Sequence, residues 1–379
     1  MFINNIKELL NRSSNVNGGS SFNLQTLIST HSPHIVSESD FSDLKYLRRE
    51  GGSVRALNLK DLEQLYEDKP SWFKFLKQYL TVHRSELFFA DKAIFIEGDT
   101  ERILVPAMIT KVDQACEQEA SNLDLPLQSQ NVSIVEVGNH FNTFERFVRF
   151  IGIKCLVITD LDGGAKIPDL DGAGVQKENK DKTLKFKSSG CRIDEAKYTS
   201  NETLKKFFSL AKGVGPIQFD DLCQLSSENK TFSSDASNWV KNPDGNLRIA
   251  YQTEETNGQG EKYHARSFED AFLHLNFDFL NDSCADADGN LVQDIQFPSL
   301  TKKHLKEFLD NPEPYQMAEN GIGSKPSFAM EVLLNSKDET VTIPRDTKLG
   351  LPQRKKTILF KNWNSPHYIS EGLMWLRKN

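Results

Sequence analysis

The sequence lacks any long apolar run, and none of its windows approaches the ~20 apolar residues that a transmembrane helix requires. Its amino terminus, MFINNIKELLNRSS, lacks the basic stretch and apolar core of a secretory signal. Cysteine is scarce, because five residues, an odd number, lie far apart without a CxxC pair. The eight histidines show no HxxxH or HExxH spacing. These absences predict a cytoplasmic protein with no membrane partner, no disulfide framework and no zinc site.

Neither sign of charge dominates the chain of 379 residues, which has 46 Lys and Arg against 53 Asp and Glu and a net charge of -7. Hydrophobic residues make up 38%, which is typical of a globular protein that buries a core. The length predicts two or three domains at roughly 100–200 residues each. Because a net charge averages over local patches, this mild acidity does not exclude nucleic acid as a partner.

From residue 91 onward, short apolar strands alternate with helical segments. This alternation predicts an α/β fold with a four-stranded, mainly parallel sheet flanked by helices. The pattern stops at 165–246, where we expect a mostly helical insert, and resumes at 247–379, which ends in a helical C-terminal part. The expected strands span 93–96, 132–137, 155–159 and 247–252, and the expected helices span 102–112, 144–150 and 268–276.

The region before this pattern is organised differently. A short amphipathic helix is expected within 2–10 and a strand at 24–29, followed by a polar turn and the start of a helix. Residues 61–90 are typical of connecting helices. The sequence therefore divides into segments 1–60, 61–90, 91–164, 165–246 and 247–379.

Five acidic residues follow the expected strands at their carboxyl ends. Glu97 closes the first strand, Glu101 lies four residues later, Asp160 and Asp162 close the third strand, and Glu269 lies in the helix after the fourth. Parallel strands present these ends at one edge of the sheet, where α/β proteins bind ligands. Each acid alone also fits a favourable place at a helix start. Together, five carboxylates need a cation to neutralise them, and hard oxygen ligands favour Mg²⁺ or Mn²⁺ and two-metal phosphodiester chemistry.

The segments around these acids resemble a known module. EGDTE after the first strand, VEVG after the second and ITDLD after the third resemble a Toprim domain, the metal-binding module of topoisomerases, primases and several nucleases. ISTHSPHIVSESDF upstream, ARSFEDAF and GSKPSFAMEVLL downstream complete an order similar to that of the OLD (overcoming lysogenization defect) family of ATP-dependent endonucleases. In that family an ABC-type ATPase precedes a Toprim nuclease. The resemblance runs from about residue 24 nearly to the end of the chain.

The resemblance implies roles for particular residues. Glu97, Glu101, Asp160, Asp162 and Glu269 would hold two Mg²⁺ or Mn²⁺ ions, with Glu97 and Glu101 also acting in catalysis. Lys325, which alone would be taken for a solvated surface lysine, would stabilise transition-state charge on the phosphate. Gly98 and Thr159 are secondary candidates. DNA is the implied substrate, and defence against phage is implied by the resemblance alone.

The chain departs from the family in its ATPase motifs. It has no GxxxxGK[ST] loop, because Pro326 stands where GIGSKP would need Ser or Thr, and it has no Walker B strand or signature loop. We therefore expect no ATP site. Residues 1–60 would be a remnant of the ATPase domain, with His31 resembling its switch histidine, and the chain would correspond to the C-terminal region of such a protein. A separate ATPase region, a regulatory protein and a second copy of the chain are left open as partners.

Two other readings of the sequence also remain open. VITDLDGG resembles the nucleophile loop of haloacid dehalogenase-type phosphatases, in which Asp160 would attack phosphorus, although EGDTE would then be unexplained. Alternatively, the chain is a noncatalytic module for assembly or DNA binding. Basic runs are usually solvated, but two could contact phosphates. They are Arg354-Lys355-Lys356 and the lysines at 177, 180, 182, 185 and 187, with Phe186 between them.

Overall fold

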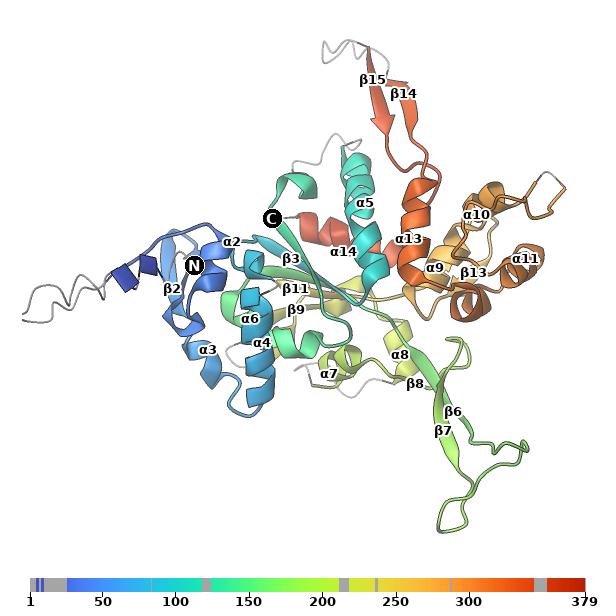
Figure 1. Ribbon diagram of the computed structural model, residues 1–379, viewed down its shortest axis with the longest axis horizontal. Coiled ribbons are helices and arrows are strands. Elements are labelled where there is room, and N and C mark those ends of the chain that lie inside the picture. Colours follow the sequence, from blue (N-terminus) through green and yellow to red (C-terminus); the bar gives the residue numbers. More distant parts are fainter. Residues whose placement is uncertain are drawn as a thin grey trace, which may run out of the picture.

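A six-stranded sheet organises the chain (Figure 1). Its order is β10-β9-β11-β5-β3-β4, and the four strands from β11 to β4 are parallel. These four are the strands that the apolar runs predict, so the parallel α/β core is confirmed. The strands are β3 (Lys92–Ile96), β4 (Val132–Glu136), β5 (Lys154–Ile158), β9 (Thr231–Asp235), β10 (Asn238–Lys241) and β11 (Leu247–Ala250). The computed structural model describes residues 5–6, 8–9, 26–82, 84–117, 124–210, 218–235, 238–286, 288–343 and 353–378.

Helices cover both faces of the sheet, which separates two hydrophobic cores. Alternate side chains of a strand point to opposite faces, so Phe95 and Val157 join one core while Ile94 and Leu156 join the other. The first core is closed by α4 (Pro70–Val82), α6 (Phe141–Ile151) and α7 (Glu202–Leu210). The second is closed by α5 (Asp99–Cys116), α9 (Phe268–Leu275), α13 (Lys325–Leu334) and α14 (His367–Arg377).

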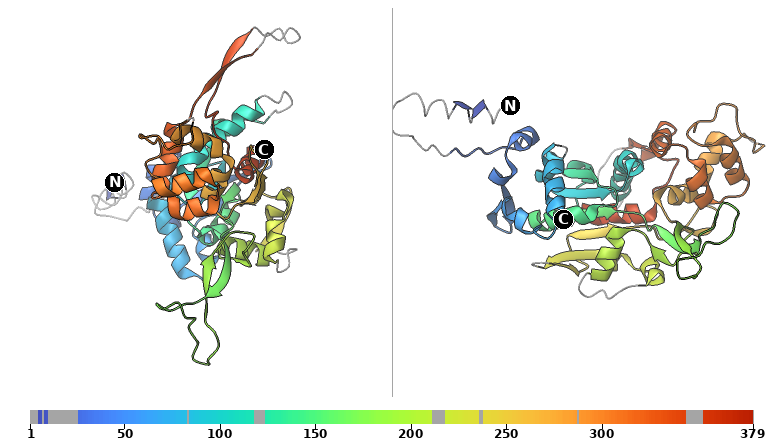
Figure 2. Two further views of the ribbon diagram at one scale, coloured as in Figure 1. Left: turned by 90° about the vertical axis from the view of Figure 1, so that its right-hand side faces the viewer. Right: turned by 60° about the horizontal axis from the view of Figure 1, so that its bottom comes forward.

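The N-terminal region packs beside the first core (Figure 2). The structure forms α2 after the polar turn and α3, α4 and η2 within 61–90. The strand expected at 24–29 is wrong over its described part, because 26–29 have no regular structure, and Leu27 is exposed with no partner strand. The helix expected within 2–10 lies largely outside the described residues. The elements are α2 (Pro33–Glu38), η1 (Phe41–Asp43), β1 (Lys45–Glu50), β2 (Ser53–Asn58), α3 (Asp61–Gln64) and η2 (Ser85–Phe88).

The insert at 165–246 is not mostly helical, which corrects the prediction. Its lysine-rich part forms an antiparallel hairpin, because short polar turns interrupt it and no apolar stripe of helical period runs through it. Its last part adds β9 and β10 antiparallel to the sheet edge. The further elements are η3 (Leu127–Ser129) before the insert, then β6 (Gly163–Pro168), β7 (Phe186–Gly190), β8 (Tyr198–Thr199), α8 (Phe219–Cys223) and η4 (Ser227–Lys230).

The C-terminal part is largely helical, with two added hairpins that the sequence does not predict. The β12–β13 hairpin precedes α9, and the β14–β15 hairpin projects beyond α13 (Figure 1). No helix in the described ranges is long and apolar enough to cross a membrane. The remaining elements are β12 (Glu254–Thr256), β13 (Lys262–His264), α10 (Phe277–Cys284), α11 (Lys302–Asp310), α12 (Pro314–Gln316), the π-helix η5 (Met317–Gly321), β14 (Glu339–Ile343) and β15 (Arg354–Ile358).

Candidate functional site

The carboxyl ends of β3, β5 and β11 create the candidate site. β3 leads through Glu97 and Gly98 into α5, whose first turn carries Glu101. β5 leads into Asp160 and Asp162, and α9 begins with a capping box of Ser267 and Asp270, which sets Glu269 in its first turn. Because β3 pairs with β5 and β5 pairs with β11, these chain segments meet at one edge.

Glu97 lies at the centre of a hydrogen-bond network. Its Oε1 accepts from the hydroxyl of Thr159, from Asn201 Nδ2 at 2.8 Å and from the backbone N–H of Asp160 at 3.3 Å. Burial raises the pKa of Glu97 above its ordinary value, although the hydrogen bond from Thr159 opposes the shift. Three donors on one oxygen hold this carboxylate in a single orientation.

Glu101 and Glu269 are almost wholly buried, with 5% and 3% of their surfaces exposed. Thr100 Oγ1 donates to Glu269 Oε1 at 3.0 Å, and Lys325 Nζ donates to Glu269 Oε2 at 2.9 Å. Burial raises the pKa of Glu101 to about 8, and repulsion from Glu269 adds to the shift. Burial lowers the pKa of Lys325, but the Glu269 carboxylate outweighs this effect and raises it overall. The predicted late lysine therefore reaches the acids.

Asp160 interacts electrostatically with the four other acidic residues of the site. Its Oδ1 accepts a 2.6 Å hydrogen bond from Gln252 Nε2. Burial raises the pKa of Asp160 well above its ordinary value, and repulsion from the four other carboxylates adds to this shift. All the other predicted acids therefore lie close enough to act on Asp160. The four that repel Asp160 are Glu97, Glu101, Glu269 and Asp162.

Asp162 lies at the rim of the group, next to an arginine. Its carboxylate is 3.2 Å from Arg266 Nη2, and its backbone has a φ of 50°, a left-handed conformation that turns the chain sharply. Arg266 also donates to Gly163 O at 3.1 Å and pairs with Glu319 of η5 at 3.3 Å. Arg266 thus ties the end of β5 to the helical C-terminal part.

The chemistry of these donors fits divalent metal ions. Carboxylates that repel one another at one sheet edge are the oxygen ligands that Mg²⁺ and Mn²⁺ take, and a cation would relieve the repulsion that helps to raise the pKa of Asp160. As placed, no three His, Cys, Asp or Glu side chains among the described residues form a ready metal-binding group. Ion binding would therefore require small side-chain shifts, such as release of Glu269 from Lys325.

Sequence reasoning missed the polar residues that hold the acids. Asn201 and Gln252 are fully buried, and Arg266 and Thr100 contact the outer carboxylates. A signal existed for Gln252, because it closes the expected strand at 247–252 as the acids close theirs. Asn201 had none, since it lies in the insert, which the sequence predicts to be mostly helical and in which no strand end is expected.

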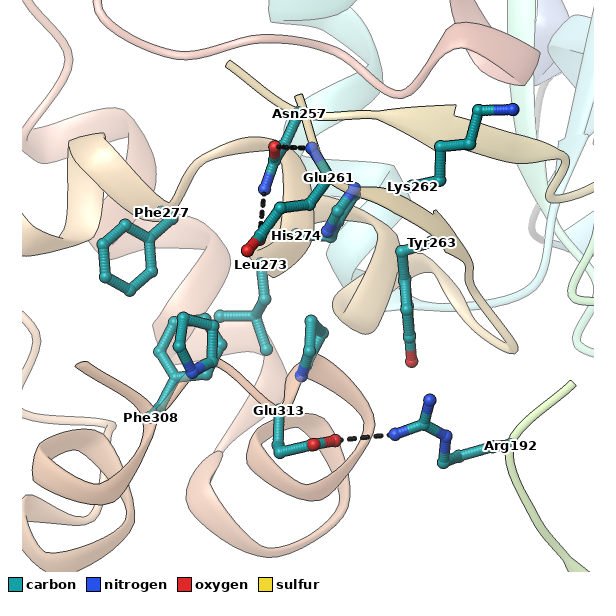
Figure 3. A pocket seen from close by; sticks show the side chains of 12 residues that line it. Arg192, Asn257, Glu261, Lys262, Tyr263, Leu273, His274, Phe277, Phe308 and Glu313 are labelled. Atoms are coloured by element: carbon teal, nitrogen blue, oxygen red, sulfur yellow. Dashed lines mark hydrogen bonds and ion pairs between the residues drawn. The ribbon is translucent and has the colours of Figure 1, made fainter. Parts of the chain in front are cut away.

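A separate open pocket of about 280 Å³ lies beside α9 (Figure 3). It has aromatic walls from Tyr263, Phe277 and Phe308, and Arg192 pairs with Glu313 at its edge at 2.7 Å. The six predicted site residues are outside its lining. The pocket is therefore distinct from the carboxylate site.

The fold and this edge define a class: an α/β domain of TOPRIM type, with its acids at the carboxyl ends of parallel strands. Residues 88–162 match the family model of the overcoming lysogenization defect protein-like TOPRIM domain. The chain therefore carries an OLD-like TOPRIM domain, and the resemblance predicted from its motifs is confirmed. The match ends at Asp162 and thus contains four of the five acids.

Proteins similar to the chain include one curated relative and the C-terminal regions of two OLD proteins. Endonuclease GajA of Bacillus cereus (strain HuB5-5) is 26% identical, in an alignment that covers all of this chain and 46% of the relative. The chain thus spans less than half the length of that relative. The C-terminal region of the Burkholderia pseudomallei OLD protein has 17% identity and a TM-score of 0.34, covering 76% of this chain and 98% of that one. The corresponding region of the Xanthomonas campestris pv. campestris OLD protein has 13% identity and a TM-score of 0.36, covering 77% and 94%.

Proposed function

We propose that the chain is a metal-dependent DNA endonuclease that hydrolyses phosphodiester bonds with two Mg²⁺ or Mn²⁺ ions. The observation that supports this most is the gathering of four other acids around Asp160 at one sheet edge, because carboxylates that repel one another are suited to binding divalent ions. The name of its relative, endonuclease GajA, supports the same reaction class. A separate ATPase region, a regulatory protein and a second copy remain proposed partners.

The proposed mechanism assigns a task to each side chain. Bound ions would activate a water molecule and stabilise the leaving oxygen. Glu97, Glu101, Asp160, Asp162 and Glu269 would hold those ions, and Asn201 and Gln252 would fix the orientation of the carboxylates that they contact. Lys325 would carry positive charge toward the scissile phosphate, where negative charge develops.

The phosphatase alternative leaves EGDTE without a role. A nucleophilic Asp160 does not explain why the Glu97 and Glu101 carboxylates lie close enough to act on it. The noncatalytic alternative leaves the repulsion unexplained, because a scaffold gains nothing from five coupled acids. Both alternatives make measurable claims.

Substrate choice separates the three readings. Purified chain is incubated with Mg²⁺ or Mn²⁺ and either supercoiled plasmid or a small phosphoester chromogen, each with and without chelator. We expect nicked or linear plasmid that chelator abolishes, and little chromogen hydrolysis. Faster hydrolysis of the chromogen would favour the phosphatase, and inertness toward both substrates together with no Mn²⁺ binding by calorimetry would favour the scaffold.

A further inference from the structure

A two-stranded arm begins at the candidate site. We define the β6–β7 arm as residues 163–190, so that its first residue directly follows Asp162. Figures 1 and 2 show the arm projecting away from the rest of the molecule, in green. Its base is fixed, because Arg266 Nε donates to Gly163 O at 3.1 Å and β6 also pairs with β8. The arm therefore has a defined start beside the acids.

The arm is positively charged in a chain that is negative overall. It holds six lysines and four acidic residues, whereas the whole chain has a net charge of -7. Three of its acidic residues form ion pairs or hydrogen bonds within the arm. Asp169 pairs with Lys177 at 3.0 Å and Lys185 at 3.2 Å, and Asp171 and Asp181 accept hydrogen bonds within their own turns. The four other lysines extend from the surface, and they are Lys166, Lys180, Lys182 and Lys187.

Both faces of the ribbon combine a lysine with an apolar side chain. Ile167 is opposite Lys187 in the ladder, so the two share a face, and Lys166 and Phe186 lie on the other face. Ile167 and Phe186 are 37% and 51% exposed. Side chains of this kind can contact both phosphates and the sugar and base edges between them.

We propose that the β6–β7 arm binds the backbone of duplex DNA and guides it to the acids, an inference that rests on the proposed nuclease function. The charge of the arm is complementary to phosphate, and its start at Asp162 brings whatever it binds to the site. A two-stranded ribbon also fits a major groove ~12 Å wide. A second copy of this chain, itself acidic, is a less complementary occupant.

The test replaces the four projecting lysines and measures binding apart from cleavage. The variant K166S/K180S/K182S/K187S is compared with a control that removes four exposed lysines elsewhere, K60S/K74S/K302S/K337S. Affinity for a fluorescent duplex is measured by anisotropy in chelator over a range of salt. Each phosphate contact contributes about 0.9 to the slope of log K against log salt, so if all four lysines contact phosphates the arm variant loses about 3.6 from that slope, and we expect it to bind at least about 10–100-fold more weakly.

The outcomes for the arm and for the nuclease are separable. Weaker DNA binding by the arm variant, with wild-type binding by the control variant, would support the inference. Failure of every protein to cleave plasmid would contradict the proposed nuclease function but not the role of the arm in binding. Wild-type binding by the arm variant would overturn the inference, as would a wild-type chain that does not bind duplex. Loss of a dimer in the arm variant by light scattering, with an unchanged salt slope, would overturn it in favour of a second copy.

Discussion

The ammonium group of Lys325 lies 2.9 Å from Glu269 Oε2, which joins the first turns of α13 and α9 across 56 residues of sequence. Glu269 is almost wholly buried, while the side chain of Lys325 is about half exposed. The lysine therefore reaches from the surface into the acidic site, where a substrate phosphate could exchange places with the carboxylate as its partner.

Lys325→Met should separate catalysis from metal binding. We expect plasmid cleavage to fall about 100-fold, because a positive group that stabilises the transition state is lost. Mn²⁺ affinity measured by calorimetry should hold or rise, since a competing cation leaves the acids. Lys302→Met on α11 is the matched control and should change neither. Undiminished cleavage by Lys325→Met would refute its role.

Glu101→Gln should abolish cleavage without unfolding the chain. The substitution keeps the shape of the side chain but removes a charge that Glu269 repels. In chelator at about pH 9 we expect the free energy of unfolding to rise by more than ~1 kcal/mol. Urea denaturation and the plasmid assay measure the two effects. A variant that is less stable yet still cleaves would contradict both.

The metal-free chain should lose stability as pH rises. The pKa of Glu101 is about 8 in the folded chain and 4.5 ordinarily, so between these values the folded state binds more protons than the unfolded state. The stabilisation is therefore complete below about pH 4.5 and lost as pH passes through about 8. Denaturation in chelator from pH 5 to 9 should show this decline. Glu101→Gln should flatten it, and an equally steep decline in the variant would assign the effect elsewhere.

Asn201 offers a test of how the acids are positioned. Its Nδ2 donates to Glu97, whereas its Oδ1 accepts from the backbone N–H groups of Thr203 and Leu204 and so caps α7. Asn201→Ser keeps a capping oxygen and adds no charge, but it loses the amide donor. We expect cleavage to fall about 10-fold with altered Mn²⁺ affinity, because an unheld carboxylate binds the ion differently. If the variant keeps its Mn²⁺ affinity and full cleavage, Asn201 only caps α7 and does not position the acids.

Replacing Lys92 should lower the free energy of unfolding without changing Mn²⁺ binding by the acids. Its Nζ donates to the carbonyls of Leu376 at 2.7 Å, Arg377 at 3.2 Å and Lys378 at 3.0 Å, and so caps the end of α14. Arg377 O and Lys378 O also accept from Gln130 and Lys154, so Lys92→Met removes the side-chain donor of the Leu376 carbonyl above all and should cost about 1–3 kcal/mol of unfolding free energy. Mn²⁺ titration should be unchanged. A shift in Mn²⁺ affinity would mean that α14 influences the acids.

The core of the fold and the acids could be predicted because both depend on local patterns. Apolar runs mark β3, β4, β5 and β11, and parallel strands bring Glu97 and Asp160 to one edge by geometry alone. The insert could not be predicted, since its hairpin depends on polar turns rather than on apolar periodicity. Asn201 was missed for a related reason. Its role depends on a tertiary contact with Glu97 across 104 residues, which no local pattern records.

The most direct test of whether the acids form a nuclease site is a plasmid-cleavage assay. It compares the wild type with Asp160→Asn side by side in Mn²⁺ without ATP. Asp160 is the residue on which the other four carboxylates act, and Asn keeps its shape without its charge. We expect chelator-sensitive nicking by the wild type and at least a 100-fold loss in a folded Asp160→Asn variant, an effect of about 2.7 kcal/mol on the barrier. Equal nicking by both proteins, or none by the wild type at high concentration, would contradict this function.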